Sequence, residues 1–303
     1  MATWTAEARV DEALARDLVA EQFAPLPRRS VELISEGWDY VVHLVDGEWA
    51  FRFPRRAVVV AGTEREIAVL GLLAPRLPVG VPAPVYVGRP TERFAWPFFG
   101  ARFLPGVEAG QATLSDDERA QMARPLARAL RALHDPAVIA EFGELLPFDP
   151  IHRADMVLRV PRTRAELSAL AELGTWQPPP ELDELLDRAA ALPAPEPRAV
   201  CHGDLHFRQL LVEGGKLTGI IDWVDVCRSD PGVDLQLAWS FLPRAARDEF
   251  FDEYGPVSEE SLLRARVVAL FLNAVLARYG NAEGMPTVEA EAVAGLRRAS
   301  AGL

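Results

Sequence analysis

Hydrophobic and polar positions follow two different patterns along the chain, and the change between them falls near residue 106. The first part opens with an acidic amphipathic pattern, which predicts a helix over residues 6–23. Apolar and polar positions then alternate as they do in half-buried strands, with an Asp46-Gly47 pair that is a strong signal for a hairpin. The strands expected from this alternation cover residues 31–35, 40–45 and 49–53.

The next segments predict one helix and two further strands. Ile67, Leu70 and Leu73 recur at helical spacing, which predicts a helix over 64–73. The stretch LPVGVPAPVYVG is rich in proline and valine, and its prolines fit the entry into an edge strand better than a central strand. A further strand is expected over 98–104, and Pro105-Gly106 ends it.

Beyond residue 106 the pattern becomes mainly helical. Ser115 followed by Glu118 is a capping box, and we expect the helix that it starts to run to about His134. A glycine-rich turn at 213–216 predicts a hairpin whose second strand covers 217–223. The other helices expected here cover 162–173, 181–192 and most of the chain from about residue 233.

These patterns predict two lobes. The smaller, at 1–105, is rich in strands, and the larger, at 106–303, is mainly helical, with a hinge between them near 100–106. The fold class we predict is therefore α+β, with an antiparallel sheet and one key helix in the N-terminal lobe.

Composition narrows the possible functions. The net charge of −12 argues against a nucleic-acid partner, and no apolar run reaches the roughly 18–20 residues that span a membrane. We therefore expect a soluble, cytoplasmic protein that acts as a monomer or a homodimer. The two cysteines are too few for a disulfide framework, and we expect both to be small buried residues. The single lysine, Lys216, falls in a hairpin turn, so we expect no lysine among the catalytic residues.

The densest chemistry lies at 200–212, in VCHGDLHFRQLLV, and just after it. The hairpin that follows brings the loop before its first strand near the residue after its second strand. Asp204, Gln209 and Asp222 should therefore lie close together. Two carboxylates and an amide oxygen suit Mg²⁺, and a carboxylate not used by the metal can accept a hydroxyl proton.

The stretches HGDLHFRQLLV and GIIDWVDVCRSDPGVDL, in this order and spacing, resemble the aminoglycoside/macrolide phosphotransferase family, which is related to the protein kinases. The resemblance extends over residues 28–250 or so. It implies a bilobal kinase-like fold and the Mg²⁺-dependent transfer of the γ-phosphate of ATP or GTP to a hydroxyl group of a small molecule. Aminoglycoside or macrolide antibiotics are the leading acceptors. A kinase of a non-antibiotic metabolite is the alternative.

The resemblance also implies roles for individual residues. Asp204 would be the catalytic base, and Asp222 and Gln209 would bind the metal. The nucleotide would be bound by Ser35 in a covering loop, by Arg52 at its phosphates with Glu66 as the partner of Arg52, and by the backbone of Arg102 and Leu104 at the base.

Two residues depart from the family pattern. Arg52 stands where kinases usually have lysine, and arginine still offers a fixed charge and bidentate phosphate binding. Gln209 stands where an asparagine is expected, and its extra methylene moves the amide oxygen by about 1.5 Å. A nucleotide-binding module without catalysis is therefore a second hypothesis, and it rests on Gln209 alone.

The remaining polar residues allow other interpretations. Asp225, Asp234 and Glu283 are candidates for contacts with the acceptor, although Asp234 also suits a cap or a brace for the loop. His202 is expected to be a buried histidine that holds the loop. A third hypothesis, a metal-dependent hydrolase, would use as ligands His202, Asp204, His206 and Asp222.

Overall fold

The computed structural model describes residues 6–24, 26, 30–37 and 39–302, and their backbone forms two compact units. The first unit runs to Arg76 and from Gly80 to Leu104, and it also includes Asp222–Val224. The second unit holds Leu77–Val79, Pro105–Ile221 and the chain from Asp225 onward. Asp222 therefore packs with residues that lie far before it in the chain.

The first unit is built on a five-stranded antiparallel sheet in the order β1-β2-β3-β5-β4. The hairpin predicted at Asp46-Gly47 is confirmed, because both residues have positive φ angles (54° and 67°), as a tight two-strand turn requires. The proline-rich segment forms an edge strand, as predicted. The strands are β1 (Val31–Glu36), β2 (Tyr40–Val45), β3 (Trp49–Pro54), β4 (Pro84–Gly88) and β5 (Phe98–Arg102).

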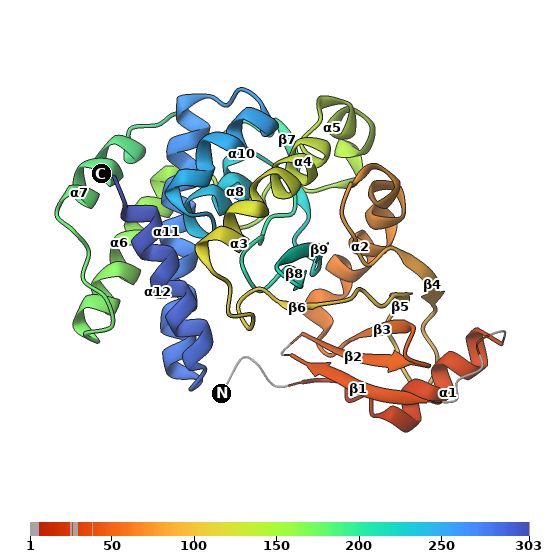
Figure 1. Ribbon diagram of the computed structural model, residues 1–303. Coiled ribbons are helices and arrows are strands. Elements are labelled where there is room, and N and C mark those ends of the chain that lie inside the picture. The colour runs from red at the N-terminus through yellow and green to blue at the C-terminus, as the bar shows by residue number, and fades with distance from the viewer. Residues whose placement is uncertain (1–5, 25, 27–29, 38, 303) are drawn as a thin grey trace. The chain divides into compact units, whose positions relative to one another are not determined.

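The two faces of this sheet carry different side chains. Phe51 and Phe53 alternate with Arg52 along β3, so the phenylalanines point to the face covered by α1 (Glu12–Gln22) and are part of its apolar core. Arg52 points to the opposite face, where it pairs with Glu66 of α2 (Val60–Leu73). Figure 1 shows α2 on this side of the sheet. Short 3₁₀ turns flank α2 at Ala57–Val59 and Ala74–Arg76.

The first helix begins later than the sequence indicated. The helix predicted over 6–23 starts only at Glu12, because the Asp11 side chain caps it by accepting a hydrogen bond of 2.8 Å from the Leu14 amide. Residues before Asp11 take no helical conformation in the described chain.

The strands of the second unit form two small sheets around the loop at 202–209. The hairpin predicted at 213–216 is confirmed. Its second strand ends at Ile220 rather than at Trp223, because Asp222 has a φ of 65°, which no strand residue adopts. One sheet has β6 (Val107–Glu108), β8 (Leu210–Glu213) and β9 (Lys216–Ile220), and the other pairs β7 (Ala199–Cys201) with β10 (Cys227–Ser229).

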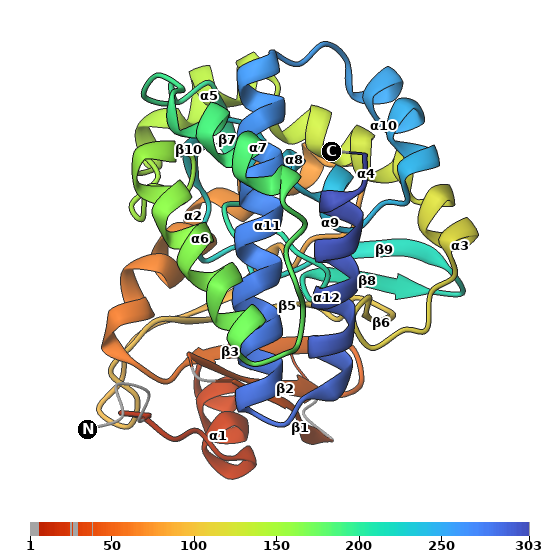
Figure 2. The same cartoon turned by 90° about the vertical axis from the view of Figure 1, so that its left-hand side faces the viewer.

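Helices make up most of the second unit, and α11 (Glu259–Ala282) lies between α6 and α12 in Figure 2. The capping box at Ser115 is present, but the single helix predicted from it is two helices that meet at Met122. Pro125 has no amide hydrogen for the carbonyl of Gln121, and this missing hydrogen bond weakens the helix next to the break at Met122. The helices are α3 (Asp116–Gln121), α4 (Ala123–Leu133), α5 (Pro136–Phe142), α6 (Met156–Glu172), α7 (Glu181–Ala190), α8 (Gly232–Leu235), α9 (Leu237–Ser240), α10 (Arg247–Tyr254) and α12 (Pro286–Ser300), with 3₁₀ turns at Gly143–Leu145 and Arg244–Ala246.

Cys201 and Cys227 are both buried free thiols, as expected, and burial raises the pKa of each thiol. Among the described residues, every helix is too short or too polar to cross a lipid bilayer.

Candidate functional site

The loop that follows β7 is held in place by a fully buried carboxylate, Asp234. Its oxygens accept hydrogen bonds from the amides of His202 (2.7 Å) and Gly203 (3.1 Å), and its Oδ2 lies 3.1 Å from Nε2 of His134. Burial raises the pKa of Asp234, but the hydrogen bond and charge of His134 and the bonds to the loop outweigh burial and leave the pKa below its usual value. Asp234 is therefore a brace for the loop, which is one of the two roles expected for it, and its side chain is fully buried.

His202 also holds this loop, as expected for a buried histidine. Its Nε2 donates to the Ile221 carbonyl at 2.9 Å, and its Nδ1 accepts from the Asp204 amide at 3.3 Å. Both ring nitrogens are therefore engaged, and His202 has no nitrogen to offer to a metal. The hydrolase hypothesis needs His202 as a ligand, so the structure gives it no support.

Gly203 takes a conformation that other residues adopt only under strain. Its φ is 92°, and a Cβ atom at this position would lie 2.4 Å from the carbonyl oxygen of Asp225. The tight turn directs the next residue, Asp204, to the surface, where its side chain is 36% exposed. The Oδ2 atom of Asp204 lies 3.7 Å from Nε2 of His206.

Gln209 ends the loop and is almost completely buried. Its backbone amide donates to the His206 carbonyl at 2.9 Å, and its backbone carbonyl accepts from the amide of Ile221 at 2.9 Å. Ile221 directly precedes Asp222 in the chain. The side-chain Oε1 is buried without a hydrogen-bond partner among the described residues. A buried amide oxygen without a partner is costly, and it fits a position that a bound cation completes.

The first unit contains a second group of predicted site residues, which lie in direct contact. Arg52 donates a hydrogen bond of 2.9 Å from Nη1 to Glu66 Oε1 and forms an ion pair through Nη2 with Asp222. The Trp223 amide donates to the same Glu66 oxygen at 3.2 Å, and the guanidinium lies over the Tyr40 ring, 3.7 Å from its centre. Burial lowers the pKa of Arg52, but Glu66 and then Asp222 outweigh it and raise that pKa, so the arginine stays charged.

Asp222 occupies this position through an unusual backbone conformation. Its φ of 65° turns the chain out of the direction of β9, and its side chain is 42% exposed. The next residue, Trp223, is buried, as expected for a packing residue. Asp222 thus has one side of its carboxylate against Arg52 and is open to solvent on another.

The residues predicted to bind the base lie at the end of β5. Arg102 is paired with Trp49 of β3, its side chain forms an ion pair with Glu48, and the Phe103 amide donates to the Glu48 carbonyl at 2.8 Å. Leu104 follows directly. Ser35, for which the resemblance implied a covering loop, lies near the end of β1, opposite Val42, and the chain leaves that strand after Glu36.

The two remaining acceptor candidates differ in their surroundings. Asp225 lies against Gly203 and is partly exposed. Glu283 is exposed at the C-terminal end of α11. Sequence reasoning missed Arg153, which binds Asp225 from a loop 72 positions earlier, and no local pattern in the sequence indicates such a pair.

The sequence pattern of the phosphotransferase enzyme family matches residues 30–267. The chain therefore belongs to this family. Among curated protein sequences, none matches it.

Solved structures show the same fold. The complex of APH(2'')-IIia with GDP and kanamycin is 24% identical, with a TM-score of 0.67, over 95% of this chain and 98% of that chain. The GDP complex of aminoglycoside 2'-phosphotransferase-IIIa is 22% identical, with a TM-score of 0.69, over 96% and 99%. Macrolide 2'-phosphotransferase MphH from Brachybacterium faecium is 22% identical, with a TM-score of 0.61, over 94% and 97%. At these identities, the similarity shows the bilobal α+β kinase-like fold.

Proposed function

We propose that this protein transfers the γ-phosphoryl group of ATP or GTP to a hydroxyl group of a small molecule. The observation that carries the proposal is the contact of Arg52 with both Glu66 and Asp222. These contacts hold the permanently charged guanidinium of Arg52, which suits phosphate, beside the carboxylate of Asp222, which suits Mg²⁺. Membership of the phosphotransferase enzyme family supports the same reaction.

Asp222 and Gln209 are the proposed ligands of Mg²⁺. The exposed side of the Asp222 carboxylate and the unpartnered Oε1 of Gln209 are both hard oxygen donors. When bound, Mg²⁺ would neutralise negative charge on the phosphates. Arg52 would bind the phosphate oxygens through the donors that its guanidinium can spare, and Glu66 would keep it in place.

Asp204 is the proposed catalytic base. The loop around it is held by Asp234 and His202, so the carboxylate is presented at a fixed position. The acceptor oxygen forms a bond to the γ-phosphorus, the bond from this phosphorus to the β–γ bridging oxygen breaks, and the acceptor proton passes to Asp204. The products are the phosphorylated acceptor and the nucleoside diphosphate.

The base of the nucleotide would bind the backbone carbonyl of Arg102 and the backbone amide of Leu104, and Ser35 would lie in the segment that covers the phosphates. The named relatives support a nucleotide donor, because two of them are complexes with GDP. They also direct the choice of acceptor, since their names refer to aminoglycosides and a macrolide. We therefore propose an antibiotic of one of these classes, and a resistance function, with a non-antibiotic metabolite as the alternative.

The substitution of glutamine for asparagine at 209 leaves a module without catalysis as the second candidate. The buried Oε1 favours an active enzyme, since a lapsed site has no reason to keep a polar atom unpaired in its interior. Metal-dependent nucleotide binding without turnover on any acceptor would favour the module instead.

The test is a coupled assay of nucleoside diphosphate release with ATP or GTP and Mg²⁺, across a panel of aminoglycosides, macrolides and amino alcohols. We expect acceptor-dependent turnover that Asp204→Asn abolishes while nucleotide affinity is kept. Turnover that survives in Asp204→Asn would contradict the role of Asp204. Nucleotide binding without turnover on the whole panel would contradict the antibiotic acceptor.

A further inference from the structure

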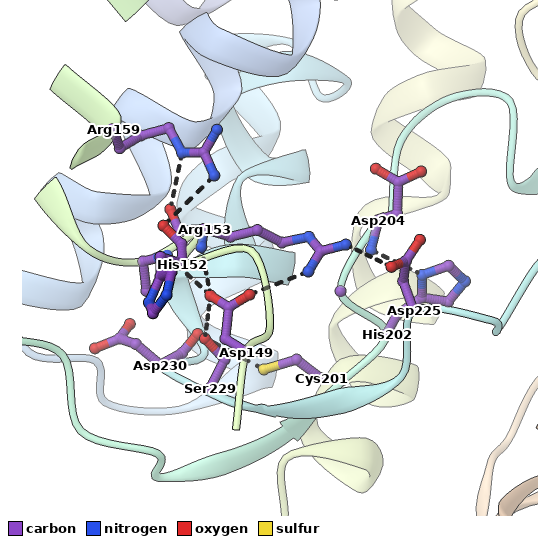
Figure 3. Close-up of polar contacts among 12 residues, drawn as sticks. Asp149, His152, Arg153, Arg159, Cys201, His202, Asp204, Asp225, Ser229 and Asp230 are labelled. Atoms are coloured by element: carbon purple, nitrogen blue, oxygen red, sulfur yellow. Dashed lines mark hydrogen bonds and ion pairs between the residues drawn. The ribbon is translucent and has the colours of Figure 1, made fainter. Parts of the chain in front are cut away.

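Arg153, just before α6, is a buried arginine that bridges two aspartates of the second unit (Figure 3). Its Nη1 donates to Asp149 Oδ1 at 3.0 Å, and its Nη2 donates to Asp225 Oδ1 at 2.7 Å. The bridge ties the loop before α6 to the segment that enters β10. None of the roles proposed above uses Arg153 or Asp149.

Asp149 anchors the arginine from one side. It is itself buried, and its Oδ2 accepts hydrogen bonds from the amides of Arg153 and Ala154 and from the Ser229 hydroxyl, the last at 3.3 Å. The carbonyl of Arg153 accepts a further bond of 3.2 Å from Arg159 Nε. Because separate bonds fix its main chain and its guanidinium, Arg153 has little freedom to move.

Asp225, on the other side, is the exposed member of the group. Its side chain is 37% exposed, and among the described residues only Oδ1 has a hydrogen-bond donor, which is Arg153. Its carbonyl packs against Gly203, immediately before Asp204. Asp225 therefore presents a carboxylate oxygen to solvent beside the loop that carries the proposed base. Figure 3 shows Asp225 near Asp204 and His202 of this loop.

Electrostatics explain why an arginine suits this position. Burial lowers the pKa of Arg153, but the acidic groups around it, Asp225 first and then Cys227, Asp149 and Asp204, outweigh burial and raise that pKa. The guanidinium stays charged, and it offsets the mutual repulsion of the neighbouring carboxylates. Its planar fork also binds two carboxylates at once, which an ammonium group cannot do with the same geometry.

We propose that Arg153 is a positioning residue for the acceptor: anchored by Asp149, it fixes the Asp225 carboxylate beside Asp204, and Asp225 binds a hydroxyl or ammonium group of the acceptor. This inference rests on the proposed phosphotransferase function. It adds the residues that hold Asp225, one of the acceptor candidates of the sequence, in place. The acceptor has to be held at more than its reacting hydroxyl, because phosphoryl transfer depends on accurate positioning.

The experiment measures kcat and KM for the best acceptor and for the nucleotide in Arg153→Gln, Asp225→Asn and the double variant. We expect either single change to raise the acceptor KM about tenfold, the scale of one charged hydrogen bond, and to leave the nucleotide KM unchanged. Since Arg153 acts through Asp225, the double variant should lose no more than Asp225→Asn alone. Arg153→Lys should recover part of the loss. A loss in Asp225→Asn confined to amine-bearing acceptors would identify an ammonium group as the ligand of Asp225.

Folding is controlled separately, because Arg153→Gln leaves Asp149 buried without its cation. The variant Asp149→Asn/Arg153→Gln removes both charges, and it should show the same rise in acceptor KM if the single variant does not fold. Arg119→Gln is the matched control, since Arg119 is a buried arginine that pairs with Glu291 at 2.8 Å in the same unit. It should lose stability without changing the acceptor KM.

The outcomes separate the two proposals. An unchanged acceptor KM in Arg153→Gln or in the charge-neutral double variant, or losses that add fully in the Arg153→Gln/Asp225→Asn variant, would overturn the inference while the phosphotransferase function stands. If the wild-type protein phosphorylates no acceptor, the proposed function fails, and the inference that rests on it falls too.

Discussion

The guanidinium of Arg52 forms an ion pair with the carboxylate of Asp222, which lies 170 positions later in the chain. Glu66 stabilises this pair, because it accepts hydrogen bonds from Arg52 at 2.9 Å and from the backbone amide of Trp223, the neighbour of Asp222, at 3.2 Å. The position of the proposed metal ligand thus depends on a helix carboxylate in α2. The pair also keeps Arg52 charged in a buried environment.

Replacing Arg52 by methionine should weaken nucleotide binding at least tenfold, about 1.4 kcal/mol, because the variant loses the only charged donor proposed for the phosphates. Calorimetric titration of the nucleotide with Mg²⁺ measures the effect. Arg93→Ala is the matched control, since Arg93 forms exposed ion pairs with Asp17 and Glu21 in the same unit. Equal nucleotide affinity in the two variants would show that Arg52 binds no phosphate.

Replacing Gln209 by leucine should separate stability from metal binding. Without Mg²⁺, the variant should be as stable as the wild type or about 1 kcal/mol more stable, because a buried oxygen without a partner is removed. With Mg²⁺ and nucleotide, the thermal stabilisation seen in the wild type should be mostly lost, as differential scanning calorimetry would show.

The matched control for Gln209 is Gln236, a second buried glutamine whose side-chain nitrogen and oxygen are both hydrogen-bonded. Its amide nitrogen donates to the Leu205 carbonyl, and its amide oxygen accepts from the Ser240 hydroxyl at 2.7 Å. Gln236→Leu should destabilise the protein with or without Mg²⁺. A similar loss of stability in Gln209→Leu without Mg²⁺ would argue against an open ligand position.

Replacing Asp234 by asparagine should cost about 2–3 kcal/mol at neutral pH, because a buried carboxylate that accepts two loop amides is lost. The folded-state pKa of Asp234 is lowered, so its stabilisation is present above the unfolded pKa and is lost as pH falls through the folded value. The stability difference between wild type and variant should therefore shrink on acidification below about pH 4.

Urea unfolding at pH 7 and at pH 3.5 measures this difference. Asp183→Asn is the control, because Asp183 has a largely exposed side chain in the same unit and should show no such pH dependence. If the difference in stability between the wild type and Asp234→Asn stays constant with pH, the negative charge of Asp234 does not contribute to the stability of the loop.

Replacing Gly203 by alanine should destabilise the loop more than the same change at Gly174. Both glycines have positive φ angles, 92° and 71°, but only at Gly203 would the new Cβ meet another backbone atom, at 2.4 Å. We expect about 1 kcal/mol for Gly174→Ala and at least about 2 kcal/mol more for Gly203→Ala, with loss of turnover. Equal costs at the two positions would show that the approach of Asp225 to Gly203 is easily relieved.

Much of the local structure could be predicted from the sequence alone. The hairpins at Asp46-Gly47 and at 213–216, the capping box at Ser115 and the edge strand at 84–88 all depend on residues within a few positions of one another. The loop motif around Asp204 likewise indicates the family through residues that lie close together in the chain. Local backbone preferences and side-chain periodicity decide such features, and both can be read from a short stretch of chain.

Only the tertiary structure decided which polar residues work together. Asp234 and Asp225 looked alike as acceptor candidates, yet one is sealed beneath the loop and the other is exposed beside it. The sequence around Arg153 does not indicate its role, because its partner Asp225 lies 72 positions away. The division has a physical reason: the free energy of a buried charge depends on the groups that folding brings around it, and these come from distant parts of the chain.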